Sequence, residues 1–320
     1  MTAPITPIAP VGVASDASAA VLRRLELIVT RRLDGLLQGD HRGLVPGHGS
    51  EPGEARLYQP GDDVRRIDWN VSARMRATHV RDSIADRELE CWLLVDQSSS
   101  LDFGTADRDK HALALEAAAA IGFLTQRGGN RLGAVLLRGD GPVTVPPRSG
   151  RQHLLAVLHR VLDAPRVDGA ATDLGAGIRR LDASMRRRGM AVVISDFLTA
   201  GPVEEWAQPL RRLAVRHDVL AVEVIDPREL ELPPVGVLTV VDPESGAVRE
   251  IQTNDPALRE RYAHAALAQR REIAAAARGA QAAHLELRTD RDWLRDVVRF
   301  VALRRRIATG AAVTLGVPHQ

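Results

Sequence analysis

The stretch Cys91-Trp-Leu-Leu-Val95, followed at once by Asp96-Gln-Ser-Ser-Ser100, decides the fold predicted for this chain. A short apolar run that ends in polar residues is typical of a buried strand in a parallel sheet, with a loop at its carboxyl end. Asp96, Ser98 and Ser100 place a carboxylate and two hydroxyls at alternate positions of that loop. Oxygen ligands of this kind suit a hard divalent cation, so the segment predicts half of a metal site.

Two later segments supply the other half of the predicted site. Thr172 lies in Gly169-Ala-Ala-Thr-Asp-Leu-Gly175, and Asp196 follows the apolar run Met190–Ser195. Each feature alone has an ordinary explanation, because Ser, Thr and Asp commonly cap helices. Their joint occurrence in this order favours a shared site, since the carboxyl ends of parallel strands lie at one edge of the sheet. We expect five side chains to hold Mg²⁺ or Mn²⁺: Asp96, Ser98, Ser100, Thr172 and Asp196.

Strand-like and helix-like patterns alternate after residue 88, which predicts an α/β fold with an open, mainly parallel sheet and helices on both faces. The apolar runs predict strands at 91–95, 132–137, 143–145, 191–195, 219–224 and 283–287. The helical patterns lie at 107–127, 151–162, 173–188, 203–216, 255–278 and 290–306. A five-residue turn at 242–246 between two short apolar runs predicts a hairpin that interrupts the alternation.

The domain organisation follows from changes in composition along the chain. Residues 1–18 are rich in Pro, Ala, Thr and Ser and predict a flexible tail. Residues 19–88 predict an accessory segment, with an amphipathic helix from Val21 to just before Gly39 and then turns and small strands. The main domain is expected at 89–307 with the hairpin insertion at 229–254, and a second flexible tail at 308–320.

Composition excludes several classes of protein. The chain has 320 residues, 45% of them apolar, with 43 basic and 41 acidic side chains and a formal net charge of +2. Only 3% of the residues are aromatic, too few for platforms on which nucleic-acid bases stack. The chain contains neither the Gly-x-x-x-x-Gly-Lys pattern of a phosphate-binding loop nor a dinucleotide-binding glycine pattern after a strand, so we expect no ATP binding. With no apolar run of membrane-spanning length and no signal peptide, we expect a soluble, cytoplasmic protein.

Cysteine, histidine and lysine are used sparingly or without metal-binding spacing. Cys91 is the only cysteine, which excludes an internal disulfide and a cysteine zinc cluster. The ten histidines show no spacing typical of metal ligands. Lys110 is the only lysine, so nearly all the positive charge is carried by arginine.

Two groups of residues resemble known families. The set Asp96, Ser98, Ser100, Thr172 and Asp196 resembles the metal-ion-dependent adhesion site of von Willebrand factor A domains. The segment from Arg56 to Arg74, Arg-Leu-Tyr-Gln-Pro-Gly-Asp-Asp-Val-Arg-Arg-Ile-Asp-Trp-Asn-Val-Ser-Ala-Arg, resembles the hallmark of the bacterial domain-of-unknown-function family fifty-eight. Ala170 and Ala171 depart from the two glycines that this family often has before the threonine.

The resemblance implies a von Willebrand A-like domain coupled to the hallmark segment. Members of this family are commonly encoded beside MoxR-type AAA+ ATPases, which implies a role as an adaptor or co-chaperone of such an ATPase. The hallmark segment has two interpretations that the sequence leaves open: a salt-bridged small sheet packed on the main domain, or a docking surface for the ATPase. The candidate docking residues are Arg56, Asp62, Asp63, Arg65, Asp68, Trp69 and Arg74.

The leading functional hypothesis is a non-enzymatic module whose metal captures an acidic side chain of a protein partner. The site carries only two carboxylates, so its cation would stay electrophilic. One alternative is a magnesium-dependent phosphatase with Asp96 as nucleophile, but such enzymes need a second carboxylate two residues on, where this chain has Ser98. Another is a scaffold whose metal site is vestigial or merely structural.

Overall fold

The computed structural model describes most of the main domain and parts of the N-terminal region. The described residues are 16–36, 55–58, 67, 69–75, 77–81, 90–127, 129–164, 172–241 and 247–308. Within these ranges, no helix is both long enough and apolar enough to cross a bilayer.

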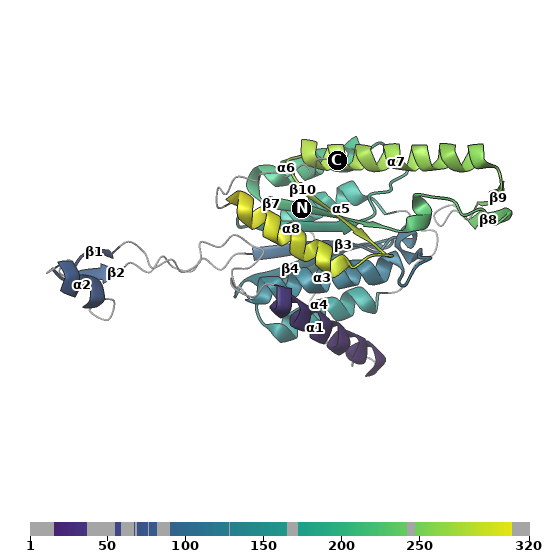
Figure 1. The fold of residues 1–320 in the computed structure, drawn as a ribbon. Coiled ribbons are helices and arrows are strands. Elements are labelled where there is room, and N and C mark those ends of the chain that lie inside the picture. The colour runs from purple at the N-terminus through teal and green to yellow at the C-terminus, as the bar shows by residue number, and fades with distance from the viewer. Residues whose placement is uncertain are drawn as a thin grey trace, which may run out of the picture.

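A six-stranded sheet forms the centre of the molecule (Figure 1). Its strand order is β10-β7-β6-β3-β4-β5, and all neighbours are parallel except β4 and β5. The strands are β3 (Glu90–Asp96), β4 (Arg131–Arg138), β5 (Gly141–Arg148), β6 (Gly189–Ser195), β7 (Asp218–Ile225) and β10 (Ala283–Arg288). The six apolar runs therefore predicted every strand of this sheet, and the mainly parallel α/β fold is confirmed.

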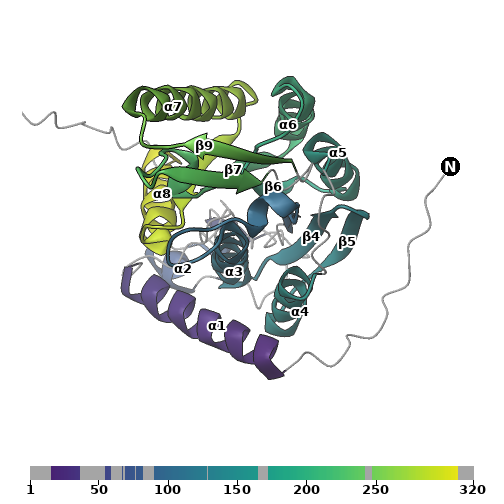
Figure 2. The same cartoon turned by 90° about the vertical axis from the view of Figure 1, so that its right-hand side faces the viewer.

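Helices cover both faces of the sheet (Figure 2). On one face, α3 (Lys110–Arg127), α4 (Arg151–Leu162) and α8 (Trp293–Ala308) pack against the strands. On the other face lie α5 (Leu174–Ser184), α6 (Glu204–Arg216) and α7 (Pro256–Gly279). Helix α1 (Asp16–Leu36) packs across α3, α4 and α8 as a further layer.

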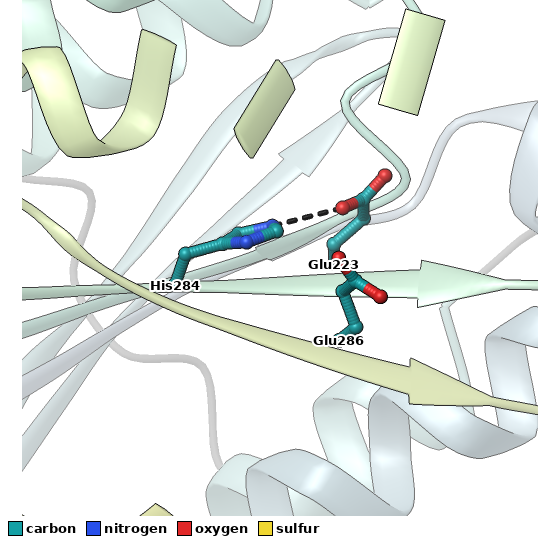
Figure 3. A group of neighbouring side chains, drawn as sticks. All are labelled: Glu223, His284 and Glu286. Carbon is teal, nitrogen blue, oxygen red and sulfur yellow. Dashed lines mark hydrogen bonds and ion pairs between the residues drawn. The ribbon is translucent and has the colours of Figure 1, made fainter. Parts of the chain in front are cut away.

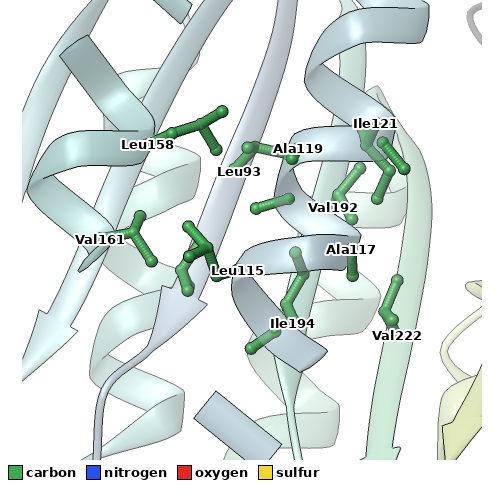
Figure 4. Packing of buried hydrophobic residues seen from close by; sticks show 14 of the residues in the cluster. Leu93, Leu115, Ala117, Ala119, Ile121, Leu158, Val161, Val192, Ile194 and Val222 are labelled. Atoms are coloured by element: carbon green, nitrogen blue, oxygen red, sulfur yellow. The ribbon is translucent and has the colours of Figure 1, made fainter. Parts of the chain in front are cut away.

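The core between α3 and the sheet is packed closely because α3 presents small side chains to large ones. Ala117 and Ile121 of α3 lie against Val192 and Val222 of the sheet, next to Leu93 (Figure 4). Helix α3 is buried almost all round, which is typical of a helix with other elements on every side. Helix α1 explains this burial, since it covers the side of α3 that faces away from the sheet.

The hallmark segment forms a small unit of its own. Strands β1 (Ala55–Leu57) and β2 (His79–Arg81) pair antiparallel, and α2 (Trp69–Met75) lies between them in the chain. The Ser72 hydroxyl accepts a hydrogen bond from the His79 backbone N–H at 2.8 Å, which ties α2 to β2. Turns and small strands were predicted here; two small strands are present, whereas helix α2 was not predicted.

The predicted hairpin is also present, as β8 (Val237–Val241) and β9 (Val248–Gln252). It follows a short 3₁₀ helix, η3 (Pro227–Glu229), and precedes α7. A second 3₁₀ helix, η2 (Ser99–Asp102), follows β3. The order of elements predicted from residue 89 onward therefore matches the structure.

Several predicted boundaries differ from the structure by a few residues. Helix α1 begins at Asp16, inside the stretch predicted as a flexible tail, and α8 reaches Ala308. Helix α3 begins at Lys110 rather than at 107, because the Asp109 carboxylate accepts a hydrogen bond from the Ala112 N–H and so begins the helix there. Helix α5 ends at Ser184, so the arginines at 186–188 lie in the turn before β6 and not at a helix terminus.

Candidate metal centre

The predicted site lies where the chain changes direction across the sheet. β3 and β6 are parallel neighbours, with Val95 opposite Ile194, so Asp96 and Asp196 leave the same edge. From β3 the chain continues through η2 to α3 on one face, and from β6 it continues to α6 on the other face. Loops that leave to opposite faces open a crevice at the carboxyl ends of the strands, which is the common ligand position in open α/β sheets.

Asp96 is the centre of the cluster and is almost fully buried. Its Oδ1 accepts a hydrogen bond from the Ser98 N–H at 3.0 Å and one from the Thr172 hydroxyl at 3.3 Å. Its Oδ2 accepts a hydrogen bond from the Ser195 hydroxyl at 2.7 Å. Asp96 thus brings together the loop after β3, the end of β6 and the segment before α5.

Ser98 and Ser100 lie side by side in the β3 loop. Their Oγ atoms are 2.9 Å apart. Ser98 stands at the N-cap of η2, yet its side chain makes no capping hydrogen bond there. Helix capping, the ordinary explanation for a serine in this loop, therefore does not account for Ser98.

Thr172 and Asp173 divide two roles that the sequence left unresolved. Asp173 is the N-cap of α5, and its carboxylate accepts a hydrogen bond from the Ala176 N–H at 2.7 Å. Thr172 instead turns its hydroxyl toward Asp96. Capping of α5 is therefore performed by the neighbour, which leaves Thr172 available to the cluster.

Asp196 lies one residue beyond β6 and is fully buried. Its Oδ1 accepts a hydrogen bond from the Leu198 N–H at 3.0 Å, and its Oδ2 lies 2.8 Å from the ammonium Nζ of Lys110. Lys110 also forms an ion pair with Glu229. Asp196 is therefore near Asp96 but already has a cation as partner.

The backbone beyond Asp196 is held in an uncommon conformation. Phe197 has φ of 56°, a left-handed value that is rare for a bulky residue. Its N–H donates to the Ser195 hydroxyl at 3.0 Å, and its ring packs on Trp206 with a centroid distance of 5.0 Å. These contacts fix the turn that carries Asp196.

Burial and like charge make the two carboxylates electrostatically unfavourable neighbours. Burial raises the pKa of Asp96 to about 6, and the negative charge of Asp196 acts in the same direction. Hydrogen bonds from Ser195 and Ser98 offset only part of this rise. Burial alone would lower the pKa of Lys110, but the charges of Asp196 and Glu229 outweigh that effect and raise it. A cation beside Asp96 would therefore relieve an existing electrostatic strain.

Comparison with models of known protein families shows to which family the chain belongs. The model described as "Protein of unknown function DUF58" matches residues 54–272, more than half of the chain. The chain belongs to the DUF58 family. A relative within the genus Mycobacterium, the uncharacterised protein Rv1480 of Mycobacterium tuberculosis, is 58% identical over 289 residues, which is 90% of each chain.

Solved structures similar to this DUF58 chain include von Willebrand A domains. The conserved hypothetical protein BatB from Bacteroides thetaiotaomicron is 14% identical, with a TM-score of 0.44 over 68% of this chain and 99% of BatB. A von Willebrand factor type A structure from Catenulispora acidiphila is also 14% identical, with a TM-score of 0.42 over 70% of this chain and 42% of that one. The fold assignment itself rests on the strand order and helix layers described above.

The DUF58 chain also contains a buried charge network that the sequence did not reveal. Arg270 of α7 lies 2.8 Å from a carboxylate oxygen of Glu223 and 2.8 Å from one of Glu229. His284 Nε2 lies 2.8 Å from the other oxygen of Glu223 (Figure 3). Together with Lys110, these residues connect Asp196 to the edge strand β10.

One part of this network could formally hold a metal ion. Potential ligand atoms of Glu223, His284 and Glu286 all lie within 4.8 Å of one another, because Glu286 pairs with Glu223 across β10 and β7. Both carboxylate oxygens of Glu223 are already paired, one with Arg270 and one with His284. The group is therefore explained as a hydrogen-bonded support for Glu223.

The candidate docking residues are only partly within the described structure. Asp62, Asp63, Arg65 and Asp68 lie outside the described residues, as does the side chain of Arg56. Trp69 and Arg74 lie on α2 with exposed side chains, and Trp69 is 72% exposed.

The five oxygen-bearing side chains predicted from the sequence lie near one another in the structure, but the prediction missed the residues that surround them. Lys110, Ser195, Glu229 and Arg270 were not among the predicted site residues. One signal could have pointed to the first of these, since a single lysine among so many arginines is unusual. The Lys110–Asp196 pair spans 86 positions in sequence, a separation at which no local pattern operates.

Proposed function

We propose that this DUF58 protein is a non-enzymatic, metal-dependent module that binds other proteins. The observation that supports this most is that the Thr172 and Ser195 hydroxyls, from two separate segments, converge on Asp96 beside the Ser98–Ser100 loop. Two of these residues, Ser98 and Thr172, perform none of the capping that would otherwise explain them. The proposed metal residues are Asp96, Ser98, Ser100, Thr172 and Asp196.

The donor set fits Mg²⁺ or Mn²⁺. Carboxylate and hydroxyl oxygens are the ligands that these cations prefer, and no sulfur lies among the five donors. Ser100 and Thr172 are partly exposed while Asp96 and Asp196 are buried, so the cluster is accessible from the hydroxyl side. When bound, the metal would supply a Lewis-acidic position that accepts a carboxylate oxygen of another protein.

The partner proposed here is a MoxR-type AAA+ ATPase together with its client, in the cytoplasm, with the DUF58 protein as adaptor or co-chaperone. The family resemblance of the hallmark segment supports this choice. The exposed Trp69 and Arg74 on α2 would supply a second, separate contact with the ATPase, since aromatic and arginine side chains dominate binding energy at protein interfaces.

The chemistry around Asp96 argues against hydrolysis. A nucleophilic aspartate of the phosphatase type needs a nearby carboxylate as acid and base. The residue two positions on is Ser98, whose hydroxyl pairs with Ser100. Asp196, the other carboxylate near Asp96, is already engaged in an ion pair with the Lys110 ammonium.

A binding assay with purified proteins tests the proposal. The protein and a candidate MoxR-type ATPase are mixed with Mg²⁺, and complex formation is measured by biolayer interferometry. We expect Asp96→Ala to weaken the complex by about 100-fold, since a lost charge-assisted contact is worth about 3 kcal/mol. Addition of EDTA should weaken the unchanged protein to the same degree.

The matched control is Asp140→Ala, because Asp140 is an exposed aspartate in the turn between β4 and β5. It should bind the ATPase as the unchanged protein does. Circular dichroism melting separates lost binding from lost folding. Binding that persists in EDTA and in folded Asp96→Ala would refute a metal-dependent contact.

A further inference from the structure

Lys110 is an unusual residue in an unusual position. It is the only lysine of the chain and is 1% exposed, at the first turn of α3. Its Nζ lies 2.8 Å from Asp196 Oδ2, pairs with Glu229, and stands 5.9 Å from the centre of the Phe103 ring. The ammonium group therefore lies beside a proposed metal ligand, at the place where a cation is expected to act.

The identity of this residue matters physically. A lysine ammonium is a compact point charge, whereas an arginine guanidinium is a broad planar group. Another interior carboxylate, Glu223, is paired with a guanidinium, that of Arg270. A compact cation at Asp196 resembles a metal ion in charge and size more closely than a guanidinium would.

We infer that Lys110 is an internal counter-cation that holds Asp196 away from direct metal coordination and so limits how tightly the site binds its metal. This inference rests on the proposed function. A carboxylate oxygen paired with an ammonium at 2.8 Å is not available to a second cation at the same time. The contacts given above for Asp96 are hydrogen bonds and not an ion pair, so of the two carboxylates among the five proposed ligands Asp96 is the one left to contact the metal directly.

The consequence concerns partner recognition. A cation held by one carboxylate and three hydroxyls keeps most of its positive charge, and therefore gains more from an acidic side chain of a partner. If Asp196 were released from Lys110, the site would bind metal more tightly and would depend less on the partner. Lys110 thus sets the division of charge between the protein's own ligands and those of its partner.

Binding of Mn²⁺ alone tests the inference, without any partner or activity. The full chain is titrated with Mn²⁺, and the free ion is measured by its electron paramagnetic resonance signal. We expect Lys110→Met to lower the Kd by about tenfold or more, since the buried ammonium that occupies Asp196 is removed. The control is Arg108→Met. Arg108 is a cation two residues before Lys110, in the loop that leads into α3, and it pairs with Glu116.

Lys110→Met leaves buried carboxylates without their cation, so its folding has to be checked by circular dichroism. The double variant Lys110→Met/Glu229→Gln removes one cation and one anion together and gives a second measurement on a balanced interior. Tighter Mn²⁺ binding by either folded variant supports the inference, also if the unchanged protein binds none.

Three results would overturn it, and they differ in what else they affect. Equal Mn²⁺ affinity in the unchanged protein and both Lys110 variants would remove the role of Lys110 and leave the proposed metal site intact. No Mn²⁺ binding by any of the three would remove both the inference and the metal site. Tighter binding by Arg108→Met to the same extent would reduce the effect to overall charge and would also overturn the role of Lys110.

Discussion

At the scale of single residues, Asp226 shows how a buried carboxylate joins separate loops beside the site. It receives two hydrogen bonds from Thr105, at 2.9 Å and 2.7 Å, one from the Arg228 N–H at 2.9 Å and one from the Thr289 hydroxyl at 2.8 Å. The loop before α3, the end of β7 and the end of β10 therefore meet at one side chain. Burial alone would raise the pKa of Asp226, but these hydrogen bonds outweigh it and lower the pKa.

Replacement of Asp226 by asparagine should lower the free energy of unfolding by about 2 kcal/mol at about pH 7, since hydrogen bonds to a charged acceptor are lost. A lowered folded-state pKa means that this stability is present above the unfolded value of about 4 and is lost as the pH falls below it. Urea unfolding from about pH 7 to about pH 3 should show the difference between Asp226→Asn and the unchanged protein shrinking with acid. Asp140→Asn serves as the exposed control, and a constant difference at all pH values would contradict this account.

How well each residue near the site could be predicted depends on whether the sequence pattern that marks it is local. The position of Asp96, Ser98 and Ser100 in one loop after a buried strand was predictable, because the strand and loop patterns are both local. The sequence could not tell which of Thr172 and Asp173 caps α5 and which faces the site. Only the hydrogen bonds of the folded chain show that Asp173 is the cap and that Thr172 faces Asp96. Lys110 was not predictable as a site residue, since its pairing with Asp196 is created by packing of α3 against the sheet edge.

At the scale of elements, the contact between β3 and β6 fixes the geometry of the site. Gly189 begins β6 directly opposite Glu90 of β3. A Cβ at Gly189 would clash with the Glu90 carbonyl oxygen. Because this oxygen belongs to the backbone, the clash cannot be relieved by a change of side-chain rotamer. The absence of a side chain here therefore allows the two strands that carry Asp96 and Asp196 to approach.

Gly189→Ala should therefore destabilise the protein by about 2 to 3 kcal/mol, as overpacking of an interior does. Gly279→Ala is the matched control, because a Cβ there would meet nothing closer than Arg211 at 4.0 Å. That control should be neutral or gain up to about 1 kcal/mol in stability. Thermal melting of both variants measures the contrast, and equal midpoints would show that the strand spacing tolerates a methyl group.

The elements themselves were largely predictable, and the errors lie at their ends. Strands β3 and β6 are buried on both faces, so continuous apolar runs mark them without ambiguity. Helix ends depend on single capping contacts, as at Asp109 for α3 and Asp173 for α5. Asp107 and Asp109 are alike in sequence, which is why 107 was predicted as the start of α3. The end of α5 is set by the Met185 N–H, which donates to backbone carbonyls of Leu181 and Asp182, and no side-chain pattern marks it, so the predicted helix ran on to 188.

At the scale of the whole molecule, elements outside the matched family region complete the fold. The DUF58 match covers 54–272, whereas α1, the end of α7, β10 and α8 lie outside it. Helix α1 buries Leu22, Leu25 and Val29 against the main domain. Ion pairs then join α1 to both of its neighbours, from Glu26 to Arg151 of α4 and from Arg32 to Asp292 before α8.

A fragment limited to residues 54–272 should therefore fail to fold, whereas a fragment of residues 16–308 should melt within a few degrees of the full chain. The shorter fragment lacks β10, which would leave β7 as an open, apolar sheet edge prone to aggregation. It also lacks α1 and α8, which together cover α3, so apolar surface worth many kcal/mol of burial would meet water. Solubility, circular dichroism and thermal melting of the two fragments provide the comparison. Cooperative melting of the 54–272 fragment near the midpoint of the full chain would show that the flanking helices and β10 are accessory, and would move the structural boundary of this fold inward to the family match.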